Sequence, residues 1–153
     1  MKLQKIVGRL QKLHPKEIDL SLDRIQNLCK RLGNPQDKLK AISVVGTNGK
    51  YSTIQAMFSI LKEANIKCNI YTSPHIIKIN ERFVFNNQEL SDEELVSLFE
   101  EIESANNNEP ITFFEILTAG YFLKASQYPD NINLIETGLF HRFDATNILK
   151  DNL

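Results

Sequence analysis

Apolar residues recur at helical spacing in the N-terminal part of the chain. Residues 2–13 and residues 20–32 each carry one apolar stripe, and each therefore predicts a short amphipathic helix. The stripes consist of Ile6, Leu10 and Leu13 in the first segment and of Leu22, Ile25, Leu28, Cys29 and Leu32 in the second. Because Gly33 then supplies a helix stop, residues 1–40 are expected to form a helical N-terminal segment.

The next part of the chain alternates between strand-like and helix-like patterns. A β-branched run over residues 41–45 ends at Gly46, a helical stripe follows over residues 51–64, and a second strand pattern covers residues 68–72. This order is typical of a βαβ crossover between parallel strands. We therefore expect residues 41–153 to form an α/β unit around a parallel sheet.

Turn and capping signals organise the following segment. Residues 83–85 followed by Asn86-Asn87 predict a small hairpin, and Ser91 with Glu94 forms a capping box that opens a helix. Thr112 and Glu115 repeat that spacing before a helix expected over about 113–126. Glu115 is also a candidate site residue, so both interpretations stay open.

A third core strand is expected over residues 132–135, and the sheet then looks unfinished. Only fifteen residues follow Gly138. We expect this last strand to lie at an uncovered edge of the sheet, where apolar side chains favour self-association. The alternative is that residues 142–153 fold back over it.

Composition excludes several classes of protein. Lysine and arginine number 18 against 19 aspartates and glutamates, a formal net charge of −1, so no overall basic field attracts nucleic acid. No apolar run approaches the roughly 18 residues of a membrane span, and the N-terminus lacks a continuous apolar signal segment. Two cysteines without metal spacing suit neither a zinc site nor a disulfide framework. We expect a cytoplasmic protein without nucleic-acid or membrane partners.

The loop after the first expected strand has features of a phosphate-binding loop. The segment Gly46-Thr-Asn-Gly-Lys-Tyr-Ser52 lies where backbone N–H groups and the helix dipole favour an anion. Its glycines permit close approach, Lys50 offers a cation, and a hydroxyl group can assist a magnesium ion. The general pattern fails at Val44 and at Tyr51, so these residues alone leave nucleotide binding and an ordinary βα turn equally open.

Four short segments distinguish the chain further by their order. They are Val45-Gly-Thr-Asn-Gly-Lys50; Tyr71-Thr-Ser-Pro-His75 with Asn80-Glu-Arg82; Thr112-Phe-Phe-Glu115; and Glu136-Thr-Gly-Leu139 with Arg142-Phe-Asp-Ala-Thr-Asn147. Together they resemble the folylpolyglutamate synthase/dihydrofolate synthase family of the Mur ligase superfamily, over essentially the whole chain. The resemblance implies a parallel-sheet P-loop α/β fold like the central domain of a Mur ligase, truncated after the third core strand.

That resemblance also implies a reaction. In the family, ATP phosphorylates the carboxylate of a pteroate or folate, and the amine of glutamate attacks the acyl phosphate. ATP and Mg²⁺ are therefore the expected cofactors, and ATP, a pteroate or folate, and glutamate the expected small-molecule partners. Residues 1–153 would form the N-terminal portion of the ATP-binding domain, with the C-terminal domain absent.

Candidate site residues follow from the matching motifs, residue by residue. The ATP phosphates would be bound by Gly46, Thr47, Asn48, Gly49, Lys50 and Ser52, with Lys50 as the catalytic cation. Ser73 and Glu136 match magnesium ligands of the family, and oxygen ligands suit that ion. The pterin and aminobenzoate side would be lined by Phe113, Phe114, Glu115, Asp144 and Ala145.

Plainer interpretations stand beside these roles. Ser73-Pro74 can be a simple strand stop, and Glu136 a solvated rim carboxylate. A hydrogen-bonded structural role is preferred to metal binding for His75. Phe113 and Phe114, taken singly, are ordinary core candidates.

The chain departs from the family pattern within the candidate site. Tyr51 replaces a glycine, and its ring either turns outward or fills the phosphate pocket. Phe140 and His141 replace two further glycines, which puts close approach of a ligand in doubt. Three hypotheses remain: part of a ligase that needs a separately encoded C-terminal half, an inactive remnant with weak nucleotide affinity, or a decayed product without a ligand. By itself the chain is expected not to complete ligation.

Overall fold

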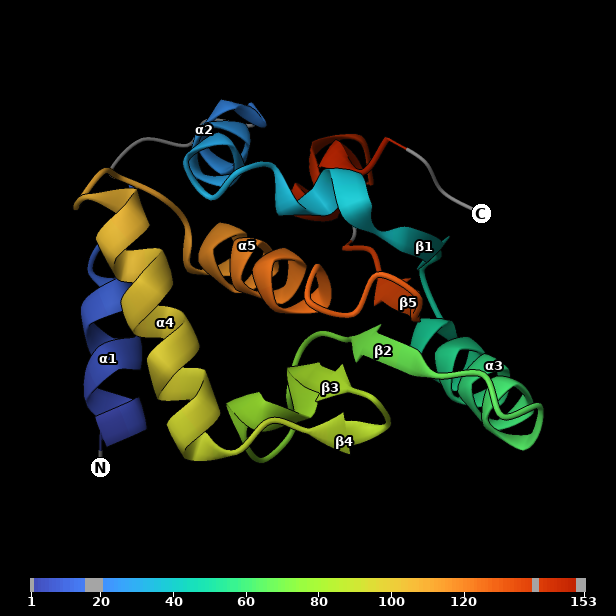
Figure 1. The fold of residues 1–153 in the computed structure, drawn as a ribbon. Coiled ribbons are helices and arrows are strands. Elements are labelled where there is room, and N and C mark those ends of the chain that lie inside the picture. The colour runs from blue at the N-terminus through green and yellow to red at the C-terminus, as the bar shows by residue number, and fades with distance from the viewer. Residues whose placement is uncertain (1, 16–20, 139–140, 151–153) are drawn as a thin grey trace.

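The computed structural model describes residues 2–15, 21–138 and 141–150. One sheet of five strands, in the order β1-β5-β2-β3-β4, runs through its centre (Figure 1). The strands are β1 (Lys40–Val44), β2 (Cys68–Tyr71), β3 (Phe83–Phe85), β4 (Gln88–Glu89) and β5 (Ile132–Glu136). Since β5 pairs in parallel with both β1 and β2, the expected parallel core of an α/β fold is confirmed.

Five α-helices surround this sheet in the described part of the chain. They are α1 (Lys2–Gln11), α2 (Asp23–Arg31), α3 (Lys50–Glu63), α4 (Asp92–Asn106) and α5 (Phe113–Ala125). Short 3₁₀ helices are η1 (Pro35–Lys38), η2 (Ile79–Arg82), η3 (His141–Phe143) and η4 (Ala145–Ile148). The helix α3 covers one face of the sheet, and the other α-helices lie on the opposite side (Figure 1).

Local sequence signals set the ends of these helices. The Ser91 and Thr112 side chains accept hydrogen bonds from the backbones of Glu94 and Glu115, which confirms both capping boxes. After α2, Gly33 and Asn34 adopt left-handed backbone conformations with φ values of 80° and 54°. That geometry ends the helix and turns the chain into β1.

The expectation that the last strand lies at an uncovered edge is wrong. Strand β5 is inserted between β1 and β2, with Ile135 opposite Ser43 on one side and Tyr71 on the other. The apolar pattern of a strand predicts that it is buried, but it does not predict which strands lie beside it. The neighbours of β5 depend on the path of the long connection through α4 and α5. Ile148 and Leu149 of the following segment join the larger core.

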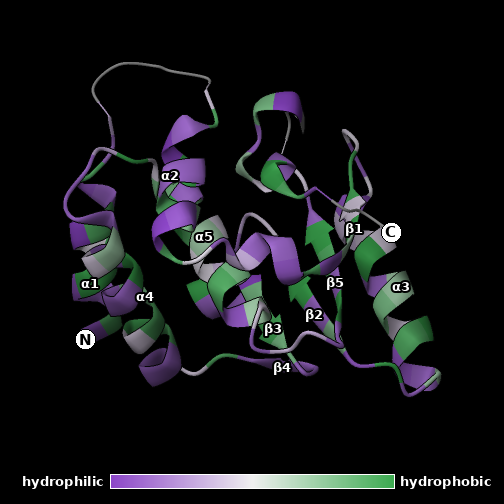
Figure 2. Ribbon diagram, turned by 45° about the horizontal axis from the view of Figure 1, so that its top comes forward, coloured by the Kyte–Doolittle hydropathy of each residue, from purple (hydrophilic) through white to green (hydrophobic). Residues whose placement is uncertain are grey.

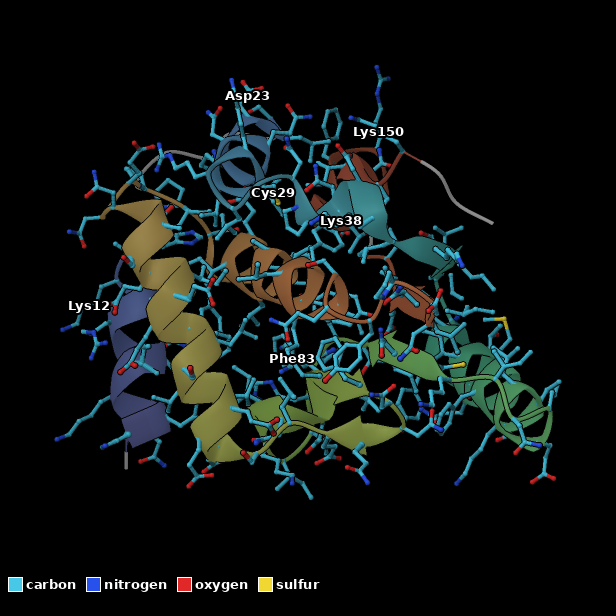
Figure 3. All side chains as sticks on the ribbon, viewed as in Figure 1. Lys12, Asp23, Cys29, Lys38, Phe83 and Lys150 are labelled. Carbon is cyan, nitrogen blue, oxygen red and sulfur yellow. The ribbon has the colours of Figure 1, made fainter. Side chains whose placement is uncertain are left out.

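Alternating strand residues build two cores of unequal size. On the α3 side, Ile70 and Leu134 pack against Ile54, whereas the opposite side holds a layer of aromatic rings. In this layer Tyr71 stacks on Tyr121 with ring centroids 4.8 Å apart. Hydrophobic and hydrophilic residues alternate along both helices and strands (Figure 2), and buried Phe83 extends from β3 into the interior (Figure 3).

A network of asparagines joins the strands within the larger core. Asn133 of β5 accepts hydrogen bonds from Asn69 of β2 and from the Tyr121 hydroxyl, and it donates to the Lys40 carbonyl of β1. Asn131 donates to Asn69 as well. Because each buried polar group has a partner here, the network fixes the register of the three parallel strands.

We predict that Asn133→Ala lowers the free energy of unfolding by about 2–4 kcal/mol, because it leaves buried donors on Asn69 and Tyr121 without an acceptor. Asn27→Ala, at an exposed position of α2, is the control and should change it by less than about 0.5 kcal/mol. Urea denaturation followed by circular dichroism measures both. An equal effect of the two substitutions would show that the network contributes nothing.

Candidate functional site

The carboxyl ends of the three parallel strands bring Lys50, Ser73 and Glu136 together. Strand β5 ends at Glu136, whose Oε2 accepts a hydrogen bond of 3.0 Å from the Ser73 backbone N–H. Its Oε1 lies 3.9 Å from Lys50 Nζ. Both charged side chains are largely buried, with 14% of Lys50 and 8% of Glu136 exposed. Three residues far apart in the sequence therefore form one polar cluster.

The loop between β1 and α3 presents backbone groups to this cluster. Gly46 and Gly49 adopt φ values of 152° and 79°, which favour glycine. No side chain caps the N-terminus of α3, unlike the capped starts of α4 and α5. The Lys50 ammonium donates a 2.8 Å hydrogen bond to the Gly46 carbonyl and so closes the loop on itself. Uncapped amides beside a held cation suit an anionic ligand.

The remaining predicted phosphate residues occupy the same loop and the first turn of the helix. Thr47 and Asn48 are exposed on the loop, and Ser52 is exposed on α3. The Thr53 hydroxyl donates to the Gly49 carbonyl, so this hydroxyl is engaged within the helix. The structure thus gathers the predicted loop residues at one end of the sheet, and their phosphate contacts stay a prediction.

A cleft of about 690 Å³ opens beside this cluster, between α3 and the β3–β4 hairpin. Phe58, Ile70 and Val84 are among its apolar lining residues, and Ser73 and Glu136 also line it. Tyr51 lines the cleft as well, with 58% of its surface exposed. A ring that is exposed and also borders this cleft leaves both alternatives for Tyr51 open.

The loop after β2 is held by one carboxylate. Glu81 accepts hydrogen bonds from the backbone N–H groups of Ile76, Ile77 and Lys78, at 2.8, 2.9 and 2.7 Å. These donors lower the pKa of Glu81, with the Ile76 N–H as the largest cause. Ile76 and Ile77 are 91% and 87% exposed on this fixed loop. Glu81 has no predicted role in the sequence, because its partners are backbone N–H groups, which every non-proline residue has.

His75 lies on the same loop and is hydrogen-bonded within the protein. Its Nδ1 accepts a 2.9 Å hydrogen bond from Arg82 Nε. The half-buried Arg82 thereby ties the Ser73-Pro74-His75 turn to η2. This contact confirms the hydrogen-bonded role preferred for His75.

The residues predicted for the pterin side have different surroundings in the described part of the chain. Phe113 borders a hollow of about 390 Å³ with His75 and Ile77, whereas Phe114 stacks on Tyr71 within the core. Glu115 accepts from the Thr112 backbone and pairs with Arg24 Nε at 3.1 Å. It is thus both a helix cap and an ion-pair partner.

Asp144 and Ala145, the other two predicted residues of that side, are buried near the end of β5. Asp144 accepts hydrogen bonds from Gly138 and Thr146. Their contact with a substrate stays a prediction. Phe140 lies outside the described residues, as does the side chain of His141.

Glu136 is the carboxylate that contacts both Ser73 and Lys50, and Glu81 and Glu89 line the same cleft. No group of three or more His, Cys, Asp or Glu side chains in residues 2–15, 21–138 and 141–150 could hold a metal ion. Glu136 with the nearby Ser73 nevertheless fits Mg²⁺, because this ion keeps several waters and commonly takes one or two carboxylates plus phosphate oxygens. No helix in the same ranges is long and apolar enough to cross a membrane.

We predict that acid releases the Ile76–Lys78 loop at a pH below the ordinary glutamate pKa of about 4.3. Since the folded pKa of Glu81 is lowered, its stabilisation is complete above that value and is lost as the pH falls through the folded pKa. Amide proton shifts of Ile76, Ile77 and Lys78 measure the transition. Glu81→Gln should abolish it and Glu93→Gln, on exposed α4 surface, should leave it unchanged. A midpoint above about 4.3 in the parent protein would contradict this assignment.

Comparison with curated proteins places these features in one family. No model of a known protein family matches the sequence. The dihydrofolate synthase/folylpolyglutamate synthase of Escherichia coli is 39% identical over 142 residues, covering 92% of this chain and 33% of that protein. The Bacillus subtilis protein of the same name is 39% identical over 137 residues, covering 84% and 32%. The chain therefore spans about a third of the length of the curated relatives it matches.

Solved structures give the same result for the fold. Escherichia coli FolC in complex with DHPP and ADP has a TM-score of 0.86 and 37% identity, covering 96% of this chain and 36% of that one. The bifunctional folylpolyglutamate synthase/dihydrofolate synthase of Yersinia pestis, complexed with AMPPNP and Mn ion, has a TM-score of 0.88 and 33% identity, covering 96% and 36%. Sequence and fold therefore both relate this chain to the dihydrofolate synthase/folylpolyglutamate synthase family, and to the N-terminal third of its members.

Proposed function

We propose that this chain provides the nucleotide and metal site of an ATP-dependent folate–glutamate ligase. The observation that carries the proposal is the meeting of Lys50, Ser73 and Glu136 at the carboxyl ends of the parallel strands. Ligands of α/β sheets bind at this end. Related structures hold ADP with DHPP, or AMPPNP with Mn, in proteins of the same fold.

Each residue has a physical task in the proposed site. The Lys50 ammonium neutralises charge on the β- and γ-phosphates, and the uncapped amides at the start of α3 donate to phosphate oxygens. Glu136 and Ser73 would hold Mg²⁺, and the ion would supply positive charge that shields the phosphates. Because Glu136 contacts both Ser73 and Lys50, the residues that would hold the metal and the lysine ammonium lie together at one end of the sheet.

The proposed reaction is activation of a carboxylate followed by amide formation. A carboxylate oxygen of the pteroate or folate attacks the γ-phosphorus of ATP, the bond to the β,γ-bridging oxygen breaks, and ADP leaves. The amine of glutamate then attacks the acyl carbon and expels phosphate. Positioning and charge neutralisation suffice for the first step, since phosphoryl transfer needs little covalent help from the protein.

We further propose that a polypeptide corresponding to the rest of the relatives' length completes the site. It belongs to the same chain or is encoded separately. Among the described strands, β1 pairs with β5 alone, so one edge of the sheet beside the loop has no described partner.

We also propose that the protein is located in the cytoplasm. Cys29 and Cys68 are free and buried, which suits a reducing compartment.

We predict that Lys50→Ala weakens binding of ATP with Mg²⁺ by about tenfold to a hundredfold, because a charged hydrogen bond contributes about 1.5–3 kcal/mol. Lys62→Ala, in the last turn of the same helix, is the matched control and should bind like the parent. Calorimetric titration measures all three proteins. Equal affinity of Lys50→Ala and the parent would remove the basis for a phosphate role of this lysine.

We also predict that the 153-residue chain alone catalyses no ligation. Among the described residues Lys50 forms an ion pair with Glu136, and no group of three or more His, Cys, Asp or Glu side chains could bind a metal ion. The assay is ADP release with ATP, Mg²⁺, dihydropteroate and glutamate. Glutamate-dependent release that disappears in Lys50→Ala would show that the chain is a sufficient catalyst.

A further inference from the structure

Asp144 uses both carboxylate oxygens within the protein. Its Oδ2 accepts a 2.9 Å hydrogen bond from the Gly138 backbone N–H, and its Oδ1 accepts from the backbone and the hydroxyl of Thr146. The residue is 9% exposed. One side chain thus bridges the segment that follows β5 and the start of η4 (Ala145–Ile148).

Gly138 makes this bridge possible by its lack of a side chain. A Cβ atom there would overlap Asp144 Oδ2. Gly138 is not among the glycines with left-handed backbone, so a side chain at this position conflicts with the Asp144 carboxylate and not with the backbone conformation. The close approach of the Asp144 carboxylate to the backbone therefore depends on both Asp144 and Gly138.

The bridge reaches the candidate metal ligand through the backbone. Glu136 lies two residues before Gly138, and Thr137 between them donates its N–H to the Val44 carbonyl of β1. The Thr137 hydroxyl also lies 3.5 Å from the Thr146 hydroxyl. Residues 136–138 are thus held on one side by β1 and on the other by Asp144 and Thr146.

We infer that Asp144 is a positioning residue that holds the end of β5 so that the Glu136 carboxylate meets Ser73 and Lys50. The inference deepens the proposed function and rests on it for the role of Glu136. It gives Asp144 a structural task beside the predicted substrate contact, because its two oxygens hold the backbone of Gly138 and of Thr146.

An aspartate is required because both of its oxygens face hydrogen-bond donors, Gly138 at Oδ2 and Thr146 at Oδ1. A carboxylate accepts at each oxygen, whereas the amide of an asparagine side chain has one acceptor and one donor of nearly the same shape. In either orientation, the amide introduced by Asp144→Asn would aim its NH₂ at a backbone N–H, of Gly138 or of Thr146. This substitution therefore breaks one half of the bridge with little change in volume.

The direct test is the Ser73 amide, which donates to Glu136 Oε2. Hydrogen exchange by NMR should show faster exchange of this amide in Asp144→Asn, by tenfold or more, with the amides of α4 unchanged. Asp130→Asn, at an exposed turn, is the control and should exchange like the parent. Unchanged exchange at Ser73 overturns the inference. Loss of protection in α4 as well overturns it too, because Asp144 would then serve global stability.

A double-mutant cycle tests the bridge without any ligand. Gly138→Ala should lower the Tm of the parent by about 3–9 °C, as expected for one overpacked methyl group. In the Asp144→Ala background the same change should cost less than half as much, because the overlapping oxygen is gone. Equal losses in both backgrounds would overturn the proposed geometry.

Nucleotide titration separates this inference from the proposed function. If the parent binds ADP more tightly with Mn²⁺ than without it, Asp144→Asn should lose that metal-dependent gain and keep metal-free ADP binding. Retention of the gain overturns the positioning role. If the parent binds no nucleotide, the proposed function fails, whereas the Ser73 exchange and the Tm cycle still decide whether Asp144 positions Glu136.

Discussion

The structure depends on the insertion of β5 between β1 and β2. This pairing places the Glu136 carboxylate between the loop that carries Lys50 and the turn that carries Ser73. The asparagine network fixes the same three strands in register at the level of Asn133, three residues before Glu136. A slip of one residue would turn every side chain of β5 to the other face of the sheet. The register of β5 therefore determines whether Glu136 reaches Ser73 and Lys50.

The same insertion explains why the sheet has two different faces near the site. On one face the aromatic layer around Tyr71 packs tightly, and burial raises the pKa of that tyrosine. On the other face α3 leaves a cleft that Tyr51 and Phe58 line. The turn that carries Ser73 separates this cleft from the hollow beside Phe113, because Ile76 borders the first and Ile77 the second. Glu81 keeps both isoleucines in place.

Features determined by local chemistry could be predicted from the sequence. The capping boxes, the stop at Gly33, the Asn86-Asn87 hairpin and the glycine loop depend on neighbouring residues alone, and each is where the pattern indicated. The position of β5 could not be predicted, because strand order depends on the long connection from β2 to β5, residues 72–131. The contacts of Asp144 with Gly138 and of Glu115 with Arg24 could not be predicted either. They depend on how the elements pack and not on the spacing of residues in the sequence.

Paramagnetic broadening by Mn²⁺ with ADP tests the central claim most directly. The account predicts that amide signals of Gly46, Ser73 and Thr137 broaden together in the isotope-labelled chain, because a cation held by Glu136 lies close to all three strand ends. It also predicts that signals of α1 and α4, on the far side of the aromatic layer, stay sharp. Broadening confined to the acidic start of α4 (Asp92, Glu93 and Glu94), or absent at the strand ends, would contradict a metal site at the end of β5.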